Sequence, residues 1–164
     1  IHKGGIMPFL RRVWFATALA TFLTVADTVA KVATQIALPT GRVVVFPKVL
    51  SLFLHYNAGL VANAKMPMPI IVAITLAVLV GCAVWLRAAW RINDTAVTIG
   101  LILILYGGIG NLTDRLADAH TTDYLLLFEH SVANISDGLV LAGILWLVVI
   151  STRKNNRGRA RFLA

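Results

Sequence analysis

Residues 69–86 read PIIVAITLAVLVGCAVWL, a run without one charged side chain. A helix rises about 1.5 Å per residue, and about 20 apolar residues span the hydrocarbon core of a bilayer. The run does not alternate between polar and apolar residues as a barrel strand does, and a helix satisfies its own backbone hydrogen bonds in lipid. This stretch therefore predicts a transmembrane helix.

Three further stretches are also long and mostly apolar, and they predict three more spans. They are residues 13 to about 37, 95 to about 112, and 134 to 150. The composition agrees, because 59% of the 164 residues are hydrophobic and 13% are charged, whereas soluble domains have about 45–50% apolar and about 25% charged residues. The predicted fold class is an all-α membrane protein with four transmembrane helices.

The two ends of the chain differ in composition from its middle. The expected division is a tag remnant at 1–6, one transmembrane domain at 7–152, and a basic cytoplasmic tail at 153–164. Arg11 and Arg12 precede the first apolar run, as in a secretory signal peptide. That run contains Asp27 and Lys31 and has no small-residue cleavage site, so we expect it to remain as a helix.

The segment between the first two predicted spans has the composition of strands. Residues 42–47 and 49–56 are rich in β-branched and aromatic residues, and turn residues bound them at 39–41 and 57–59. We expect a small β-like extracytoplasmic platform between helices one and two. Residues 60–68 are expected to hold a short interfacial helix.

Basic residues lie mainly on one side of the predicted bilayer. The net charge is +8, but Lys and Arg lie at the ends of apolar runs rather than among aromatic residues, so nucleic acid is not an expected partner. Ten lie on one side: Lys3, Arg11, Arg12, Arg87, Arg91, Arg153, Lys154, Arg157, Arg159 and Arg161. Four lie on the other: Arg42, Lys48, Lys65 and Arg115. Because basic loops stay in the cytoplasm, we expect both termini to be cytoplasmic.

Carboxylates collect on the opposite, outer side. Five lie in or beside the loop between the third and fourth spans: Asp114, Asp118, Asp123, Glu129 and Asp137. Asp27 lies about 14 residues after Val13, or about 21 Å along a helix, which places it in the outer leaflet. Ionisable residues at this depth are costly and point to function. The sequence therefore predicts a site near the outer membrane surface.

Several polar residues have both a structural and a functional interpretation. Asp27 and Lys31 lie four residues apart on one helix face, where they either neutralise each other or serve the site. Asn111 and Arg115 have the same spacing and point the same way if the third helix continues beyond residue 112.

Two shorter features also remain open. Asn57-Ala58-Gly59 is either an ordinary turn or part of the site. Asn134 and Asp137, at the start of the fourth span, either cap that helix and complement its dipole or carry function.

Two carboxylates at a partly desolvated site suit acid–base work on water. One of two such groups keeps its proton near neutral pH, so the other takes a proton from water while the first donates one. The pair titrates as a unit, so the acid and the base are not assigned separately. No Ser–His–carboxylate order is evident, so the sequence does not indicate a serine nucleophile. Cys82 is the only cysteine, and no Cys/His cluster has the spacing of a zinc site. We therefore expect neither metal nor cofactor.

These residues resemble a known family, the lipoprotein signal peptidases or signal peptidase II, which are membrane aspartyl peptidases with four transmembrane helices. The resemblance covers nearly the whole chain from the first span to Ile150. Its motifs are Asp27-Thr28-Val29-Ala30-Lys31, Asn57-Ala58-Gly59, Gly107-Gly108-Ile109-Gly110-Asn111-Leu112-Thr113-Asp114-Arg115, Asp123, and Asn134-Ile135-Ser136-Asp137.

The resemblance implies a site and a substrate. Asp123 and Asp137 would be the catalytic pair, which cuts a lipoprotein signal peptide before a cysteine that bears diacylglycerol. The supporting residues would be Asn57, Gly59, Asn111, Arg115, Asn134, Asp27 and Lys31. The expected setting is the bacterial inner membrane, with a prolipoprotein and membrane lipids as partners, the site near the outer leaflet, and the protein a monomer.

Two other functions are open. In a small ion- or proton-coupled transporter, Asp27 and Lys31 would form an intramembrane relay, which requires ionisable groups near the midplane. In a catalytically silent relative, the same residues would only bind lipidated peptides.

Overall fold

The computed structural model describes residues 6–59 and 66–162, with the side chains of the last helix described as far as Arg153. Its four helices are α1 (Ile6–Ala37), α2 (Met68–Arg91), α3 (Thr95–Asp118) and α4 (Ile135–Phe162). Each is long and apolar enough to cross a membrane, α4 over Ile135–Arg153. The prediction of four transmembrane helices is confirmed.

Several helix ends lie beyond the predicted limits, and the two ends of α3 have local causes. α3 begins after Asp94, whose side chain accepts a hydrogen bond from the backbone N–H of Val97, and it ends at Ala119 in a left-handed conformation. α3 therefore runs six residues beyond the predicted end at 112. α1 begins before residue 13, and α4 continues past residue 150.

The strands form one antiparallel sheet in the order β1-β2-β3-β4. Its members are β1 (Arg42–Phe46), β2 (Leu50–Asn57), β3 (Thr121–Leu127) and β4 (Ser131–Ala133). The predicted platform between α1 and α2 is confirmed as β1 and β2, whereas β3 and β4, from the segment between α3 and α4, were not predicted. The expected interfacial helix at 60–68 lies mostly outside the described residues, and Met66 and Pro67 are not helical.

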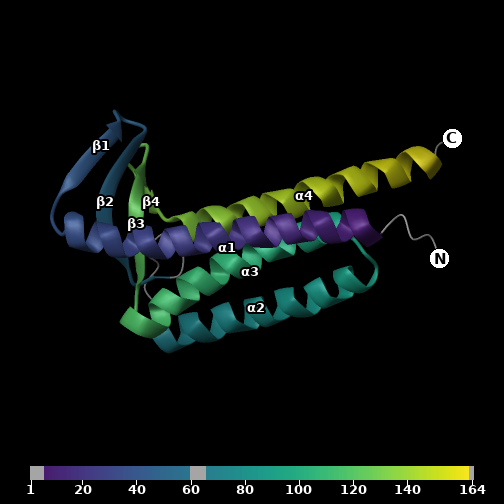
Figure 1. Cartoon of the computed structure of the whole chain (residues 1–164), viewed down its shortest axis with the longest axis horizontal. Helices are drawn as coiled ribbons and strands as arrows, with labels where there is room; N and C mark the ends of the chain where they lie inside the picture. The colour runs from purple at the N-terminus through teal and green to yellow at the C-terminus, as the bar shows by residue number, and fades with distance from the viewer. Residues whose placement is uncertain (1–5, 60–65, 163–164) are drawn as a thin grey trace.

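The sheet joins two loops that are far apart in the sequence. β2 pairs with β3 so that His55 lies opposite Asp123 and Asn57 opposite Thr121. Figure 1 shows the sheet at the end of the helical bundle away from both termini. The pairing therefore holds Asp123 at the sheet end of the bundle, beside the start of α4.

α3 is the central helix and lies against α1, α2 and α4 (Figure 1). Small residues make this possible, because a Cβ added at Gly107 would lie 2.3 Å from the backbone oxygen of Ser136. The approach of α4 to α3 at this level fixes the first turn of α4, which carries Asp137. Close approach over glycine is typical of helix packing in membranes.

Gly107→Ala is expected to destabilise the fold. The added methyl group would meet a backbone atom, which cannot rotate away, and overpacking of this kind typically costs about 1–3 kcal/mol. The matched control is Gly138→Ala, where a Cβ would meet nothing within 4 Å. Thermal unfolding in detergent should show a lower midpoint for Gly107→Ala only; equal midpoints would contradict the packing argument.

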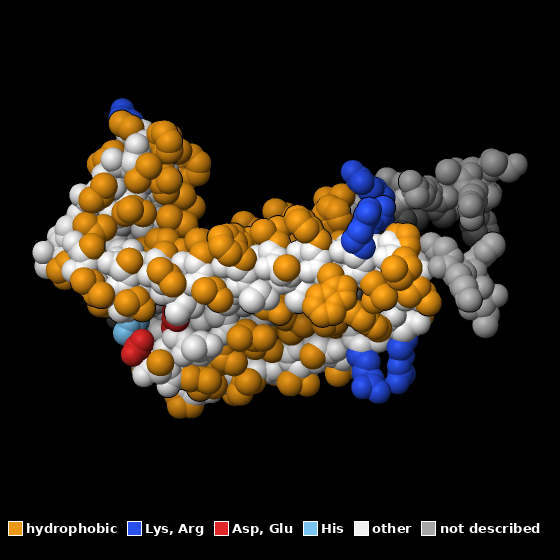
Figure 2. Space-filling view, in the orientation of Figure 1, with side chains coloured by type: hydrophobic (Ala, Val, Ile, Leu, Met, Phe, Trp, Pro, Cys, Tyr) orange, Lys and Arg blue, Asp and Glu red, His pale blue; other side chains and the backbone are white. Residues whose placement is uncertain are grey.

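The surface separates apolar, basic and acidic regions. Figure 2 shows hydrophobic side chains along the helices and over the sheet, with most of the visible Lys and Arg at the end near the termini. The visible Asp, Glu and His lie at the sheet end. In a membrane, the exposed apolar residues along a spanning helix would contact lipid rather than water.

Candidate active site

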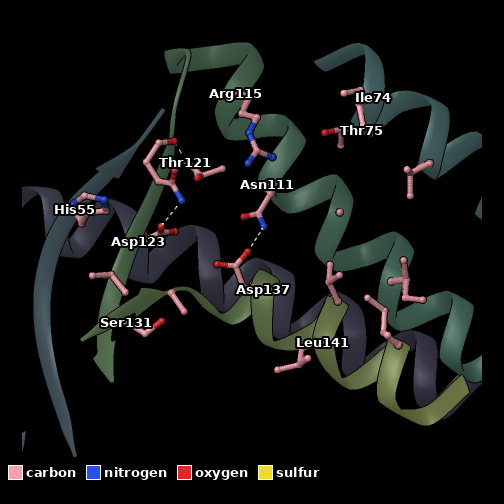
Figure 3. Close-up of a pocket in the computed structure, with 18 of the residues that line it drawn as sticks. His55, Ile74, Thr75, Asn111, Arg115, Thr121, Asp123, Ser131, Asp137 and Leu141 are labelled. Carbon is pink, nitrogen blue, oxygen red and sulfur yellow. Dashed lines mark hydrogen bonds between the residues drawn. The ribbon is translucent and has the colours of Figure 1, made fainter. Parts of the chain in front are cut away.

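A cavity of about 890 Å³ opens where the sheet meets the helices. Asp123 of β3 and Asp137 of α4 both line it, together with Asn111 and Arg115 of α3 (Figure 3). The two aspartates come from different elements on either side of β4. The fold therefore brings two carboxylates to one cavity, as the sequence predicted.

Asp123 is 1% exposed and is held by two side-chain amides. The Nδ2 group of Asn57 donates to its Oδ2 atom at 3.1 Å, and that of Asn134 donates to its Oδ1 atom at 2.6 Å. Burial, and then the negative charge of Asp137, raise the pKa of Asp123 to about 6, although the two amide hydrogen bonds oppose this. Asp123 is thus a carboxyl group that exchanges its proton close to neutral pH.

Asn134 joins the two aspartates. The Oδ1 atom of Asn134 accepts from the backbone N–H of Asp137 at 2.8 Å. The backbone N–H of Asn134 donates in return to Oδ2 of Asp137 at 3.4 Å. This is a reciprocal helix cap, and the side-chain Nδ2 remains free to hold Asp123. Asn134 therefore caps α4 and also contacts Asp123, while its role in the site stays a prediction.

Asp137 is held from the other side by α3. The Nδ2 group of Asn111 donates to its Oδ1 atom at 2.7 Å, and Figure 3 shows this bond between the two helices. Arg115 lies one turn further along α3 and donates from Nη2 to the backbone oxygen of Gly59 at 3.3 Å. Because α3 continues to Asp118, Asn111 and Arg115 reach the same cavity.

The turn at residues 57–59 also reaches the cavity. Oδ1 of Asn57 accepts from the backbone N–H of Gly59 at 2.9 Å, which closes the turn, and Nδ2 of the same side chain holds Asp123. The Nε atom of Arg115 is buried and has no hydrogen-bond partner among the described residues. The guanidinium of Arg115 therefore has one N–H that is enclosed by the protein without an acceptor in the part of the chain that the structure describes.

A buried ionic group lies behind the cavity. Nζ of Lys31 lies 2.7 Å from Oδ2 of Asp27 and 2.8 Å from Oδ2 of Asp114, and it donates to Oδ1 of Asn111 at 3.4 Å. Asp27 and Lys31 are 1% and 4% exposed. Lys31 therefore orients the Asn111 side chain that holds Asp137.

Sequence reasoning gave no role to three residues that this region uses. Asp114 lies inside the glycine-rich motif, but its partner Lys31 comes from another helix. Tyr124 and Ser136 are neighbours of the two aspartates, and both donate to Asp27. Helical spacing could not reveal these contacts, because each joins residues far apart in the chain. Among the described residues, no group of three His, Cys, Asp or Glu side chains could hold a metal ion.

Protonation of Asp123 is expected to make the folded protein more stable. Its pKa near 6 lies above the usual 3.8, so between about pH 4 and pH 6 the folded chain binds more protons than the unfolded chain. The free energy of unfolding should therefore fall as pH rises through this window. Thermal midpoints from pH 4 to 8 should show this fall relative to Asp123→Asn, which does not titrate; parallel curves would contradict it.

The model of one protein family matches residues 19–153, and its description is Signal peptidase (SPase) II. Among curated relatives, a lipoprotein signal peptidase of Pseudomonas fluorescens is 29% identical over 87% of this chain and 89% of its own length. One of Pseudomonas aeruginosa is 28% identical over 98% and 96%. One of Bartonella tribocorum is 33% identical over 51% of this chain and 52% of its own length.

Solved structures with the same fold are also known. A bacterial membrane enzyme at 2.3 Å resolution superposes with a TM-score of 0.73 over 87% of this chain and 90% of its own, at 18% identity. A second, at 1.9 Å resolution, gives a TM-score of 0.65 over 83% and 91%, at 19% identity. These two similarities concern the fold alone, whereas the family match covers most of the chain and its polar motifs.

Proposed function

The chain belongs to the signal peptidase II family and is therefore a protease, and from this premise we propose that Asp123 and Asp137 are its catalytic pair. The proposed reaction is hydrolysis of the peptide bond before a diacylglyceryl-modified cysteine in a prolipoprotein. The observation that carries the proposal is the convergence of a buried carboxylate from a strand, Asp123, and a half-buried one from a helix, Asp137, on one cavity.

The chemistry follows from sharing one proton between the two carboxyl groups. Burial, and then the negative charge on Asp137, disfavour ionisation of Asp123 and raise its pKa, so the pair holds a proton at a pH where a lone aspartate would not. The ionised member takes a proton from the attacking water, and the protonated member donates to the substrate. The roles belong to the pair, which titrates as a unit.

The walls of the cavity fit a substrate that is apolar beyond the cleaved bond. From the aspartates the cavity extends along Ile74, Val78 and Leu79 of α2 and Val140 and Ile144 of α4. These side chains lie within membrane-spanning segments, so the groove is lined as an acyl chain or an apolar peptide segment requires. Proteins similar to this chain are named lipoprotein signal peptidases, and the proposed lipidated precursor would bring both an acyl chain and an apolar peptide segment to these walls.

The supporting residues fall into three groups: those that hold the aspartates, one that would contact the substrate, and two that lie behind the cavity. Asn57, Asn134 and Asn111 fix the two carboxylates, and Gly59 closes the turn that orients Asn57. Arg115, which lines the cavity, would contact the substrate backbone beside the aspartates. Asp27 and Lys31 would brace the site from behind, since neither lines the cavity.

The proposed setting is the bacterial inner membrane, with both termini in the cytoplasm and the aspartates near the outer leaflet. The charge distribution supports this orientation, because most of the visible Lys and Arg lie at the end near the termini (Figure 2). A single chain supplies every group of the proposed site, which supports action as a monomer.

The transporter alternative fits less well. A relay through Asp27 and Lys31 needs ionisable groups near the midplane with access from both sides. Here Asp27 and Lys31 bond to Asp114, Tyr124 and Ser136, which lie at the sheet end of the helices.

The test is cleavage of a purified diacylglyceryl-modified prolipoprotein in detergent, read by mass spectrometry, for the parent protein and for variants of each aspartate. The unmodified prolipoprotein serves as the substrate control. A parent protein that binds the lipidated substrate without cutting it would favour the silent-relative alternative.

A further inference from the structure

Asp27 binds the chain neighbours of both candidate catalytic residues. Its Oδ1 atom accepts from the hydroxyl of Tyr124 at 2.9 Å, and its Oδ2 atom accepts from Oγ of Ser136 at 2.6 Å. Tyr124 directly follows Asp123, and Ser136 directly precedes Asp137. One carboxylate on α1 is therefore bonded to the β3 segment and to the α4 segment at once.

Two backbone contacts extend the same arrangement. The N–H of Ile135, at the start of α4, donates to Oδ1 of Asp27 at 2.9 Å. On the other side of Asp123, the N–H of Thr122 donates to Oδ2 of Asp114, which shares Lys31 with Asp27. The ionic group behind the site thus contacts the residues on both sides of Asp123 and the first residues of α4.

We propose that the Tyr124 and Ser136 hydroxyls are positioning groups, which fix the separation and orientation of the two aspartates through the shared carboxylate of Asp27. This rests on the proposed function of the pair. Neither hydroxyl touches the substrate cavity, since neither residue lines it.

Burial makes the arrangement rigid. Tyr124 is 3% exposed and Ser136 is 0% exposed. The Ser136 side chain also lies against α3, where a Cβ on Gly110 would be 2.3 Å from its Oγ atom. Hydrogen bonds to a charged acceptor are stronger than those between neutral groups, and a low-dielectric site strengthens them further.

The consequence for catalysis is specific. A small displacement of one carboxylate from the other disturbs proton transfer more than substrate binding, because proton transfer depends on hydrogen-bond reach. Loss of either hydroxyl should therefore lower kcat and leave KM nearly unchanged.

The test uses Tyr124→Phe and Ser136→Ala, each of which removes one hydroxyl and keeps the remaining shape. We expect kcat for the lipidated prolipoprotein to fall about tenfold in each, as for a lost hydrogen bond to a charged group, with KM within about twofold. Tyr56→Phe and Thr28→Val are the matched controls, because they remove hydroxyl groups from exposed residues of β2 and α1. Both controls should keep the parent kcat.

The results are read on protein that elutes as a folded, monodisperse species, well below its thermal midpoint. If Ser136→Ala does not fold, Tyr124→Phe decides the test. An unchanged kcat, or a loss confined to KM, overturns the inference. Asp123→Asn in the same assay separates the two hypotheses: its full activity would overturn the proposed function, whereas its inactivity beside an unchanged kcat in both hydroxyl variants would overturn only the positioning role.

Discussion

Asp123→Asn is expected to slow cleavage of a diacylglyceryl-modified prolipoprotein by about a thousandfold or more, the scale of a lost general acid or base. Asparagine has nearly the same shape as aspartate, but it neither gains nor releases a proton at these pH values. Asp137→Asn should cause a loss of similar size, because in the proposed mechanism the pair acts on one water and either half alone is incomplete. The measurement is the initial rate in detergent, read as the mass of the released peptide.

Asp118→Asn is the matched control for both substitutions. Asp118 is an exposed carboxylate at the end of α3, and it does not line the cavity. It should retain the parent rate. Far-ultraviolet circular dichroism should show that all three variants keep their helices, since the backbone hydrogen bonds within the helices do not involve these side chains and an asparagine oxygen at position 137 still accepts from the backbone N–H of Asn134. Undiminished cleavage by Asp123→Asn or by Asp137→Asn would refute the two-aspartate mechanism.

The sequence predicted best what depends on local spacing. Long, mostly apolar runs such as 69–86 predicted the spans, because charged side chains are costly in lipid and are therefore rare in a transmembrane helix. Spacing of four placed Asn111 and Arg115 on one face of α3, and spacing of three paired Asn134 with Asp137 across a helix cap. These relations need only the geometry of one helix.

Contacts between distant segments were beyond the reach of such reasoning. β3 begins TTD, with three polar residues that are all buried, so it lacks the alternation that identifies a half-buried strand. Its register with β2, which puts Asn57 beside Asp123, depends on pairing across more than sixty residues. Asp27 could be recognised as unusual, but its partners Tyr124 and Ser136 lie near the other end of the chain.

The ionic group behind the site also accounts for the presence of a lysine, Lys31, in the apolar helix α1. Lys31 faces two carboxylates, Asp27 and Asp114, and a buried ion pair contributes little net stability compared with apolar residues of similar volume. Its value lies elsewhere, because its contact with Asn111 connects the group to Asp137. On the proposed function, Lys31 is therefore needed to hold Asn111 beside Asp137 rather than to stabilise the fold.

Lys31→Met is consequently expected to cost about 3–5 kcal/mol of stability, the usual penalty for removing one partner of a buried pair. Methionine fills the space but leaves Asp27 and Asp114 without their cation, at 1% and 17% side-chain exposure. Lys48→Met, at an exposed position in the β1–β2 turn, is the matched control and should cost little. Denaturant unfolding in mixed micelles measures both.

A second substitution separates charge from packing. Adding Asp27→Asn to Lys31→Met removes one unpaired carboxylate, so the double variant should be more stable than the sum of the two single effects predicts. The hydrogen bonds from Tyr124, Ile135 and Ser136 still find an acceptor in the asparagine oxygen, but without the charge that strengthens them. The double variant should therefore fold better than Lys31→Met while cleaving poorly. Strict additivity of the two costs would mean that Lys31 acts through its packing and not through its charge.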